Sequence, residues 1–328
     1  MLLLNAAEVE DALPMLECIS AMKGAFLALS AGSVELPMRT RISVEEEDGV
    51  VLFMPAFLNH GDQQVLCLKT VAVFPRNVEI DLPTIHAAVL VLNAITGQIE
   101  AVLEGGRLTA IRTGAASGAA TDLLAREDCQ VGAVFGAGVQ GRTQLQAICS
   151  VRNLERVWIF DPNQKNAQQL VEELSGLTPI PIDLKVANSP KQAVKNADLI
   201  CTATTAISPV FNDEDLKPGV HINGVGSYTP DMIEIPPKTI ERASIFVGSR
   251  VGVLAEAGEI LAAIDQGFLD ENELVELGEV ISKNKPGRID QDQITFFKSV
   301  GVAVQDAAAA SVVLKNARRM NIGKKISW

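Results

Sequence analysis

Residues 131–141 read Val131-Gly132-Ala133-Val134-Phe135-Gly136-Ala137-Gly138-Val139-Gln140-Gly141, so a short apolar run passes directly into a glycine-rich turn. The next residues, 142–148, place apolar side chains at helical spacing, and a second apolar run, Val157–Phe160, ends in Asp161. The predicted order is therefore strand, glycine-rich turn, helix, strand and acidic residue. This order is typical of a dinucleotide-binding unit, and it favours that function over a glycine turn in some other α/β domain.

Each glycine of the turn has an expected role. Gly136 allows the tight turn, Gly138 lets the backbone approach a pyrophosphate, and Gly141 lets the helix pack closely on the strand. The N-terminus of the helix then points unpaired N–H groups at the phosphates. The cofactor-binding residues predicted in this turn are Gly136, Ala137, Gly138, Val139, Gln140 and Gly141.

The acidic residue after the second strand bears on the choice of cofactor. Asp161 would accept hydrogen bonds from the ribose hydroxyls of NAD(H), and its charge would repel a 2′-phosphate. No arginine follows it closely, which favours NAD(H). Asn163, Gln164 and Lys165 could still form a phosphate pocket, so the sequence leaves NADP(H) open.

Length and composition limit the classes of protein to which the chain can belong. The 328 residues suggest two domains, and a hydrophobic content of 48% can bury a large core. The net charge of −12 argues against nucleic acid or an anionic membrane surface as a partner. There is no apolar run of about 18 or more residues, the length that a membrane-spanning helix needs.

Cysteine and histidine usage predicts a protein of a reducing compartment without a metal centre. The 5 cysteines are scattered and lack C-x-x-C spacing, as expected for free thiols in the cytoplasm. The 3 histidines lie far apart in sequence, which makes a zinc site unfavourable. The apolar start Met1–Leu4 has no basic region before it and is interrupted by Asn5, so it predicts a first strand and not a signal peptide.

Hydrophobic periodicity predicts a β-rich first part and an alternating α/β second part. Residues 9–31 predict a helix that is broken near Pro14, and 108–125 predict a second helix. The strands expected in the first part are 50–54, 64–73, 87–93 and 99–104, and those in the second part are 131–135, 157–160, 182–186, 198–202, 220–224 and 244–247. The expected fold class is α/β, with a Rossmann-type doubly wound parallel sheet over 121–299. A second, α+β domain would comprise 1–120 with 300–328, including an Ala-rich helix at 299–319.

Three basic residues of the first part stand in unusual surroundings. Arg39, close to Arg41 at a strand start, could hold a substrate carboxylate in a bidentate contact or could lie on a charged surface strand. Lys69 lies in an apolar run, as a snorkelling edge residue or as a partly buried functional amine. Arg112 is the single charged residue between Leu108 and Ala120, so a buried carboxylate or other anion is expected as its partner.

Two predicted strands end in small and hydroxyl-bearing residues. These ends are 201–205 and 223–228. The carboxyl ends of parallel strands face the cofactor crevice of a doubly wound sheet. Small side chains there would leave room for a nicotinamide ring.

Over nearly its full length the chain resembles the ornithine cyclodeaminase and mu-crystallin family. The matching segments are Leu36–Thr40, Leu68–Val71, Leu82–Thr84, Leu108–Ala115, Gly136–Gly141, His221–Gly226 and Phe297–Gly301. The resemblance implies an N-terminal domain for substrate binding and dimerisation, completed by the C-terminal helix, and an NAD(P) domain between them. A homodimer is therefore expected.

The resemblance also implies the site residues. Arg39, Lys69 and Arg112 would surround the carboxylate and imine of a small imino acid or amino acid. Arg112 would in addition contact the cofactor. The remaining cofactor-lining residues implied are Thr84, Asp161, Thr202, Val225 and Ser299.

One departure from the family pattern concerns catalysis. Cyclodeaminases of this family carry an Asp after the Asn-x-x-Gly motif as acid and base for the substrate amine, and this chain has Tyr228 there. Asp231, three residues on, matches the mu-crystallin pattern instead. A tyrosine, with a reference pKa near ~10, is a poor base at neutral pH. The missing Asp therefore favours imine reduction, in which Tyr228 would shape the pocket and relay a proton.

The sequence thus predicts an NAD(P)H-dependent reductase of a cyclic ketimine carboxylate, with Δ1-pyrroline-2-carboxylate converted to L-proline as the first choice. Lys69, Arg112 and Tyr228 are its predicted catalytic residues. The alternatives are an ornithine cyclodeaminase, which would make proline and ammonia from L-ornithine, and an alanine dehydrogenase. A third class is a non-enzymatic ligand-binding protein of the mu-crystallin kind.

Overall fold

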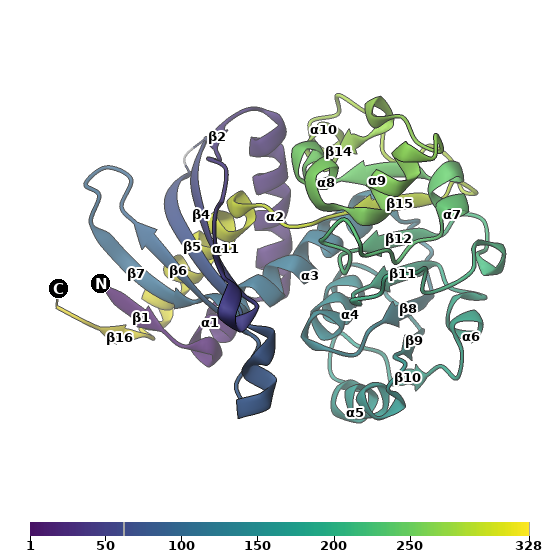
Figure 1. The fold of residues 1–328 in the computed structure, drawn as a ribbon, viewed down its shortest axis with the longest axis horizontal. Coiled ribbons are helices and arrows are strands. Elements are labelled where there is room, and N and C mark those ends of the chain that lie inside the picture. The colour runs from purple at the N-terminus through teal and green to yellow at the C-terminus, as the bar shows by residue number, and fades with distance from the viewer. Residues whose placement is uncertain (62, 328) are drawn as a thin grey trace. The chain divides into compact units, whose positions relative to one another are not determined.

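The computed structural model describes residues 1–61 and 63–327 (Figure 1). The chain forms two compact units: unit 1 is Met1–Arg112 together with the chain from Val302 onward, and unit 2 is Thr113–Gly301. The first junction lies inside helix α3 (Gly105–Leu124), earlier than the division after residue 120 that the sequence predicts. The second junction, after Gly301, lies close to the predicted one.

Unit 1 is built on one mixed sheet. Its strand order is β16-β1-β7-β6-β5-β4-β2, with β3 also paired to β4, and β1 and β7 are its parallel pair. The strands are β1 (Leu2–Leu4), β2 (Val34–Glu35), β3 (Thr40–Val44), β4 (Gly49–His60), β5 (Gln63–Val73), β6 (Ile85–Leu92), β7 (Ile99–Glu104) and β16 (Lys324–Lys325). The helices are α1 (Ala6–Ala12), α2 (Met15–Ser30), the first turns of α3, α11 (Ala303–Met320) and the 3-10 helices η1 (Glu45–Glu47) and η2 (Pro75–Ile80). Pro14 separates α1 from α2, as predicted, because proline cannot donate the backbone hydrogen bond of a helix interior.

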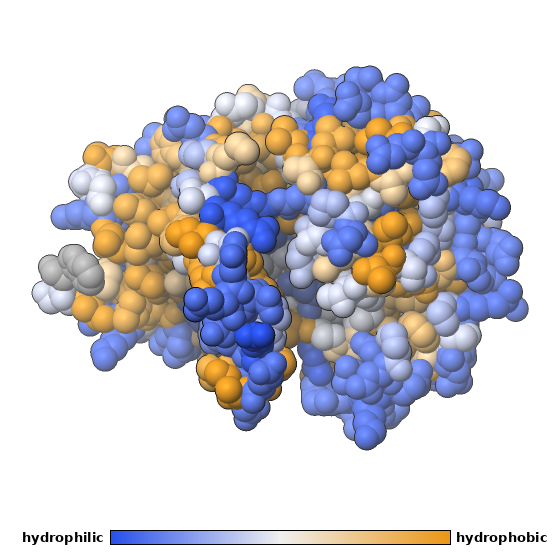
Figure 2. All heavy atoms as spheres, viewed as in Figure 1, coloured by the Kyte–Doolittle hydropathy of each residue, from blue (hydrophilic) through white to orange (hydrophobic). Residues whose placement is uncertain are grey.

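The two faces of this sheet have different neighbours. Helix α11 packs against β4, β5 and α2, and it runs along these strands in Figure 1. Because side chains alternate along a strand, Val65, Cys67 and Lys69 of β5 are buried on one face, whereas Leu66 and Leu68 on the other face are partly exposed. Figure 2 shows hydrophobic residues gathered over the strands of this unit.

Unit 2 is a doubly wound α/β unit. Its sheet has the strand order β10-β9-β8-β11-β12-β15-β13-β14, and all these neighbours are parallel. The strands are β8 (Val131–Phe135), β9 (Arg156–Phe160), β10 (Asp183–Val186), β11 (Leu199–Thr202), β12 (His221–Gly224), β13 (Ser244–Val247), β14 (Val275–Glu276) and β15 (Thr295–Lys298). The helices are the rest of α3, α4 (Val139–Val151), α5 (Gln164–Leu174), α6 (Pro190–Val194), α7 (Pro237–Arg242), α8 (Arg250–Glu256), α9 (Gly258–Asp265), α10 (Leu277–Ile281), η3 (Asp213–Asp215) and η4 (Glu271–Glu273).

The six strands predicted in this unit are confirmed, but the prediction missed two. β15 inserts between β12 and β13, and β14 forms an edge. The Thr295–Lys298 segment is fully buried, and four residues are too few for an alternating pattern to stand out. The terminal helix accordingly begins at Ala303 and not at 299.

The described part of the chain has neither a single helix suited to cross a membrane nor a cluster suited to hold a metal ion. No single helix there is both long and apolar enough to cross a membrane; α1 and α2 meet that test only as a pair bent by 79°. The described residues include no group of three or more His, Cys, Asp or Glu side chains that could hold a metal ion. All five cysteines are free and buried.

Candidate active site

A buried lysine lies in the middle of the sheet of unit 1. Lys69 pairs with Met54 on β4 and with Val89 on β6, and its side chain faces α11. The residue is only 3% exposed. Its ammonium nitrogen lies 2.7 Å from Oδ2 of Asp306, on α11, which is also fully buried. Lys69 is therefore not a snorkelling side chain, because its ammonium group is buried against Asp306 and does not reach solvent.

Arg112 contacts the other oxygen of the same carboxylate. Its Nε donates to Oδ1 of Asp306 at 3.0 Å, and its Nη1 donates to Oε1 of Gln305 at 3.2 Å. Gln305 is itself held by the Val302 backbone N–H, which donates to the same Oε1 at 2.9 Å. The buried carboxylate or other anion that the sequence predicts as the partner of Arg112 is therefore the carboxylate of Asp306.

The charges of this cluster do not balance. Two buried cations, Lys69 and Arg112, share the single carboxylate of Asp306, so the cluster carries a net positive charge. An uncompensated buried charge is costly, and an anionic ligand would relieve that cost. The cluster is thus suited to bind the carboxylate of a small acid.

The ionisation of the cluster follows from burial and from its internal pairing. Burial opposes the ionised form of Asp306, but Arg112 and Lys69 outweigh it and hold the pKa of the carboxyl below its ordinary value. Burial lowers the pKa of the Lys69 ammonium, assisted by Arg112 and opposed by Asp306. Lys69 is therefore a better proton donor than an ordinary lysine.

Two further residues predicted for the site belong to unit 1. Arg39 is partly buried just before β3, and burial together with the charge of Arg41 lowers the pKa of its guanidinium. Thr84 is partly buried just before β6, where its carbonyl accepts from the Phe74 N–H at 2.8 Å. Their contacts with substrate and cofactor stay predictions.

The glycine-rich turn of unit 2 has the geometry that the sequence suggests. Gly136 has φ +94°, and a Cβ there would lie 2.5 Å from the carbonyl oxygen of Ala203. A Cβ on Gly141 would overlap the carbonyl oxygen of Gly136, so the helix can approach the turn this closely only with glycine. At Gly138, by contrast, a Cβ would meet nothing within 4 Å, so the backbone is open to a ligand.

The turn opens into a crevice that fits a dinucleotide. Gly138 is the N-cap of α4 and makes no side-chain capping bond, which leaves the first N–H groups of the helix available to phosphates. Asp161 directly follows β9, and its oxygens accept from the Ala137 N–H at 2.9 Å and the Asn163 N–H at 2.8 Å. The crevice has a volume of about 550 Å³ and is lined by Phe135, Gly136, Gly138, Phe160, Asp161, Pro162, Ala203, Thr204, Thr205, Ala206, Ser208, Pro209 and Val210.

The remaining predicted residues lie at the carboxyl ends of the central strands. Thr202 is fully buried, and its backbone carbonyl accepts from the Val225 N–H at 3.0 Å. The Ser299 N–H donates to the carbonyl of Gly224 at 3.2 Å. The side chain of Tyr228 is exposed by 47%, in the loop that follows β12.

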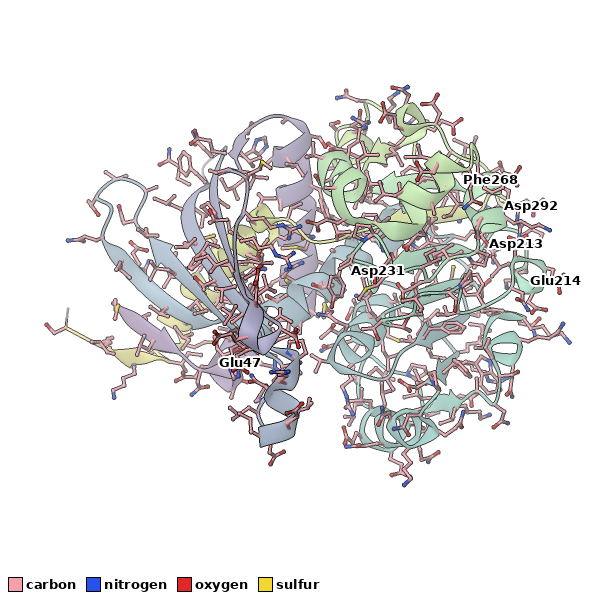
Figure 3. The ribbon with its side chains drawn as sticks, viewed as in Figure 1. Glu47, Asp213, Glu214, Asp231, Phe268 and Asp292 are labelled. Carbon is pink, nitrogen blue, oxygen red and sulfur yellow. The ribbon has the colours of Figure 1, made fainter. Side chains whose placement is uncertain are left out.

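Asp231 lies further along this loop (Figure 3). Its Oδ1 accepts from the Thr229 hydroxyl at 2.6 Å, and this hydrogen bond lowers the pKa of the carboxyl. It is thus an exposed carboxylate held in a local turn, and the low pKa makes it a poor proton donor or acceptor at neutral pH.

Sequence reasoning missed Asp306 and Gln305. The pattern that singled out Arg112 also marks Asp306, because it is the single charged residue between Val300 and Leu314. An isolated acid and an isolated base in two apolar helices could have been paired on that ground. Glu234, another buried acid, was likewise not recognised as part of a site.

A dinucleotide crevice in an α/β unit, together with a buried cationic cluster in a second unit, defines a nicotinamide-dependent oxidoreductase of small acids. The sequence model of the ornithine cyclodeaminase/mu-crystallin family matches residues 1–321, so the chain belongs to that family.

Similarity to individual proteins extends over the whole chain. It is 35% identical to a Δ1-pyrroline-2-carboxylate reductase of Bacillus cereus over 100% of both chains. Its structure is similar to the Δ1-pyrroline-2-carboxylate reductase of Thermococcus litoralis in complex with NADH and L-proline, with 39% identity, a TM-score of 0.93 and coverage of 99% and 100% of the two chains. It is also similar to an archaeal alanine dehydrogenase dimer with bound NAD, with 31% identity, a TM-score of 0.91 and coverage of 100% and 99%.

Proposed function

We propose that this protein reduces Δ1-pyrroline-2-carboxylate to L-proline with NADH. The observation that carries the proposal is the buried cluster in which Lys69 and Arg112 share Asp306. Its excess positive charge suits the carboxylate of a small imino acid. The similarity to reductases of this substrate, one of them in complex with NADH and L-proline, supports the same choice.

The chain's own residues would bind and polarise the substrate. Arg112, aided by Arg39, would hold the carboxylate, and this contact would fix the orientation of the ring. Lys69 would donate a hydrogen bond to the imine nitrogen and supply the proton that this nitrogen gains. Asp306 would keep the ammonium of Lys69 in place. When bound, NADH supplies the hydride for C2, so that hydride and proton together convert C=N into CH–NH.

The cofactor would be held by the turn of unit 2. Gly138 and the N-terminus of α4 would receive the pyrophosphate, and Asp161 would face the ribose hydroxyls. A carboxylate in that position favours NADH, and we propose NADPH as the weaker alternative.

A homodimer is proposed from the sheet of unit 1. On the face opposite α11, Pro55, Leu68, Leu90 and Val102 pair across four neighbouring strands and are all partly exposed. A row of apolar side chains on an open sheet face is typical of a protein interface. The dimer of the similar archaeal alanine dehydrogenase supports a second copy of the chain as its occupant.

The experiment that tests the proposed function compares three substrates, each with the cofactor that its reaction needs. We expect rapid loss of NADH absorbance with Δ1-pyrroline-2-carboxylate, and no ammonia from L-ornithine with NAD, because Tyr228 stands where cyclodeaminases carry an Asp. Pyruvate with ammonia tests alanine dehydrogenase activity. Faster turnover of pyruvate, or release of ammonia from ornithine, would contradict the proposal. Tight NADH binding without turnover of any imino acid would indicate a binding protein.

A further inference from the structure

A buried glutamate lies at the carboxyl edge of the sheet of unit 2. Glu234 is completely buried. Its Oε2 accepts from the Thr202 hydroxyl at 2.9 Å and from the N–H groups of Gly226 and Ser227 at 2.8 and 3.1 Å. Its Oε1 accepts from the N–H and the hydroxyl of Thr204 at 2.7 and 2.8 Å. A single carboxylate thus holds the chain after β11 and the chain after β12.

The two segments that Glu234 joins are in close contact. A Cβ on Gly226 would overlap the backbone of Thr204 and the carboxylate of Glu234, so this approach requires glycine. The first segment, 203–206, lines the dinucleotide crevice together with Gly136 and Asp161. The second segment leads directly into the loop that carries Tyr228.

A buried ion pair accompanies this carboxylate. Nζ of Lys298, at the end of β15, lies 2.7 Å from Oε1 of Glu259, and both side chains are fully buried. Burial raises the pKa of the Glu234 carboxyl, and the charge of Glu259 adds to this increase. The charge of Lys298 and the hydrogen bonds from Thr204 oppose it. Charge-assisted hydrogen bonds of this kind are stronger than neutral ones, so the contact between the segments is firm.

We propose that Glu234 is a positioning residue of the cofactor site, which acts by holding the crevice wall at 203–206 against the segment that leads to Tyr228. Glu234 contacts neither cofactor nor substrate, because its oxygens are used by the protein. It determines where Thr204 and Ala203 lie, and Ala203 in turn contacts Gly136 of the turn. The inference rests on the proposed use of a nicotinamide dinucleotide.

The test is Glu234→Gln, which keeps the size of the side chain but turns one acceptor oxygen into an NH2 group that faces N–H or O–H donors. We expect the Kd for NADH, measured by calorimetry, to rise by at least about ten-fold, since hydrogen bonds to a charged group are lost. In the ligand-free variant, amide hydrogen exchange should accelerate at 203–206 and 226–228. Both readouts are independent of turnover.

Asp198→Asn is the matched control. Asp198 is a buried acid of the same sheet that also accepts from backbone N–H groups, those of Gln130 and Val131 at 2.9 Å, but at the amino edge of the strands. We expect this variant to lose stability against urea while its Kd for NADH stays within about two-fold of the wild type, because its contacts lie far along the strands from the crevice.

The inference would be overturned if the wild type and folded Glu234→Gln had equal Kd values for NADH. It would also be overturned if Glu234→Gln and Asp198→Asn raised this Kd by the same factor. Should Glu234→Gln not fold, Thr202→Val provides the second variant. The Thr202 side chain is fully buried and its hydroxyl donates to Glu234, so the substitution removes a donor to Glu234 and no exposed group of the cofactor site, and it preserves the shape of the side chain. Its Kd should rise by about two- to five-fold, and an unchanged Kd would count against the inference. A wild type that binds NADH but reduces no imine would contradict the proposed function and leave the role of Glu234 intact.

Discussion

The ammonium nitrogen of Lys69 lies 2.7 Å from Oδ2 of Asp306, in a place from which solvent is almost completely excluded. The same carboxylate receives Nε of Arg112 on its other oxygen at 3.0 Å. The carboxylate of Asp306 thus holds the side chains of Lys69 and Arg112 in place, and the three groups together carry an excess positive charge. In a site of low dielectric constant this excess positive charge attracts the carboxylate of a substrate. The charge of Arg112 also lowers the pKa of Lys69, so that Lys69 gives up its proton more easily.

We predict that Asp306→Asn moves the alkaline limb of the pH profile of kcat/KM to lower pH. The proposed mechanism needs protonated Lys69, so activity falls as the pH rises through the pKa of this lysine. Asp306 raises that pKa against the effect of burial, so its removal should lower the pKa of Lys69 further. Glu17→Gln is the control, because Glu17 contacts the same helix through Asn316. An unshifted limb in Asp306→Asn would exclude Lys69 as the proton donor.

Arg112→Lys should lower kcat/KM for the imino acid by about a hundred-fold, with a higher KM and a lower kcat. Lysine keeps the charge but lacks the planar fork that can hold Asp306, Gln305 and a carboxylate at once. Arg107→Lys, on the same helix but partly exposed, should leave both constants unchanged. Steady-state kinetics of the two variants make the comparison. Wild-type constants in Arg112→Lys would refute the proposed role.

Leu68→Glu should convert the proposed dimer into a monomer. The substitution places a charge in the apolar row of Pro55, Leu90 and Val102, where burial against a second copy would be costly. Gln64→Glu places the same side chain at the exposed end of the same strand face and should leave the assembly intact. Light scattering coupled to size-exclusion chromatography distinguishes the outcomes. A monomeric wild type, or a dimeric Leu68→Glu, would contradict the proposed interface.

The free energy of unfolding should decrease at acidic pH because of His221. Burial, assisted by the charge of Arg288, lowers the pKa of this histidine to about 3, against 6.5 for an ordinary histidine. Between these two pKa values His221 is protonated in the unfolded chain but not in the folded chain. The free energy of unfolding therefore decreases as the pH falls. From pH 7.5 to pH 5 this effect amounts to about 2 kcal/mol. In urea unfolding, the free energy of unfolding of the wild type should decrease over this pH range by that amount more than that of His221→Gln. An equal pH dependence of the two proteins would refute the prediction.

Local patterns in the sequence were sufficient for much of the nucleotide-binding unit. The turn at Gly136–Gly141, the helix after it and Asp161 follow one another along the chain, so their mutual geometry depends on a few neighbouring residues. The need of Arg112 for a buried carboxylate or other anion also follows from sequence, because an unpaired charge in an apolar helix is unfavourable whatever the fold.

Only the tertiary structure decides which residues meet across long separations. Asp306 reaches Arg112 across 194 positions of the chain because α11 returns to the sheet of unit 1, and no periodicity in either segment encodes that return. The insertion of β15 between β12 and β13, and the five hydrogen bonds that converge on Glu234, have the same origin. Helix and strand patterns arise from contacts over a few residues, whereas the pairing of distant buried charges is set by the packing of whole elements.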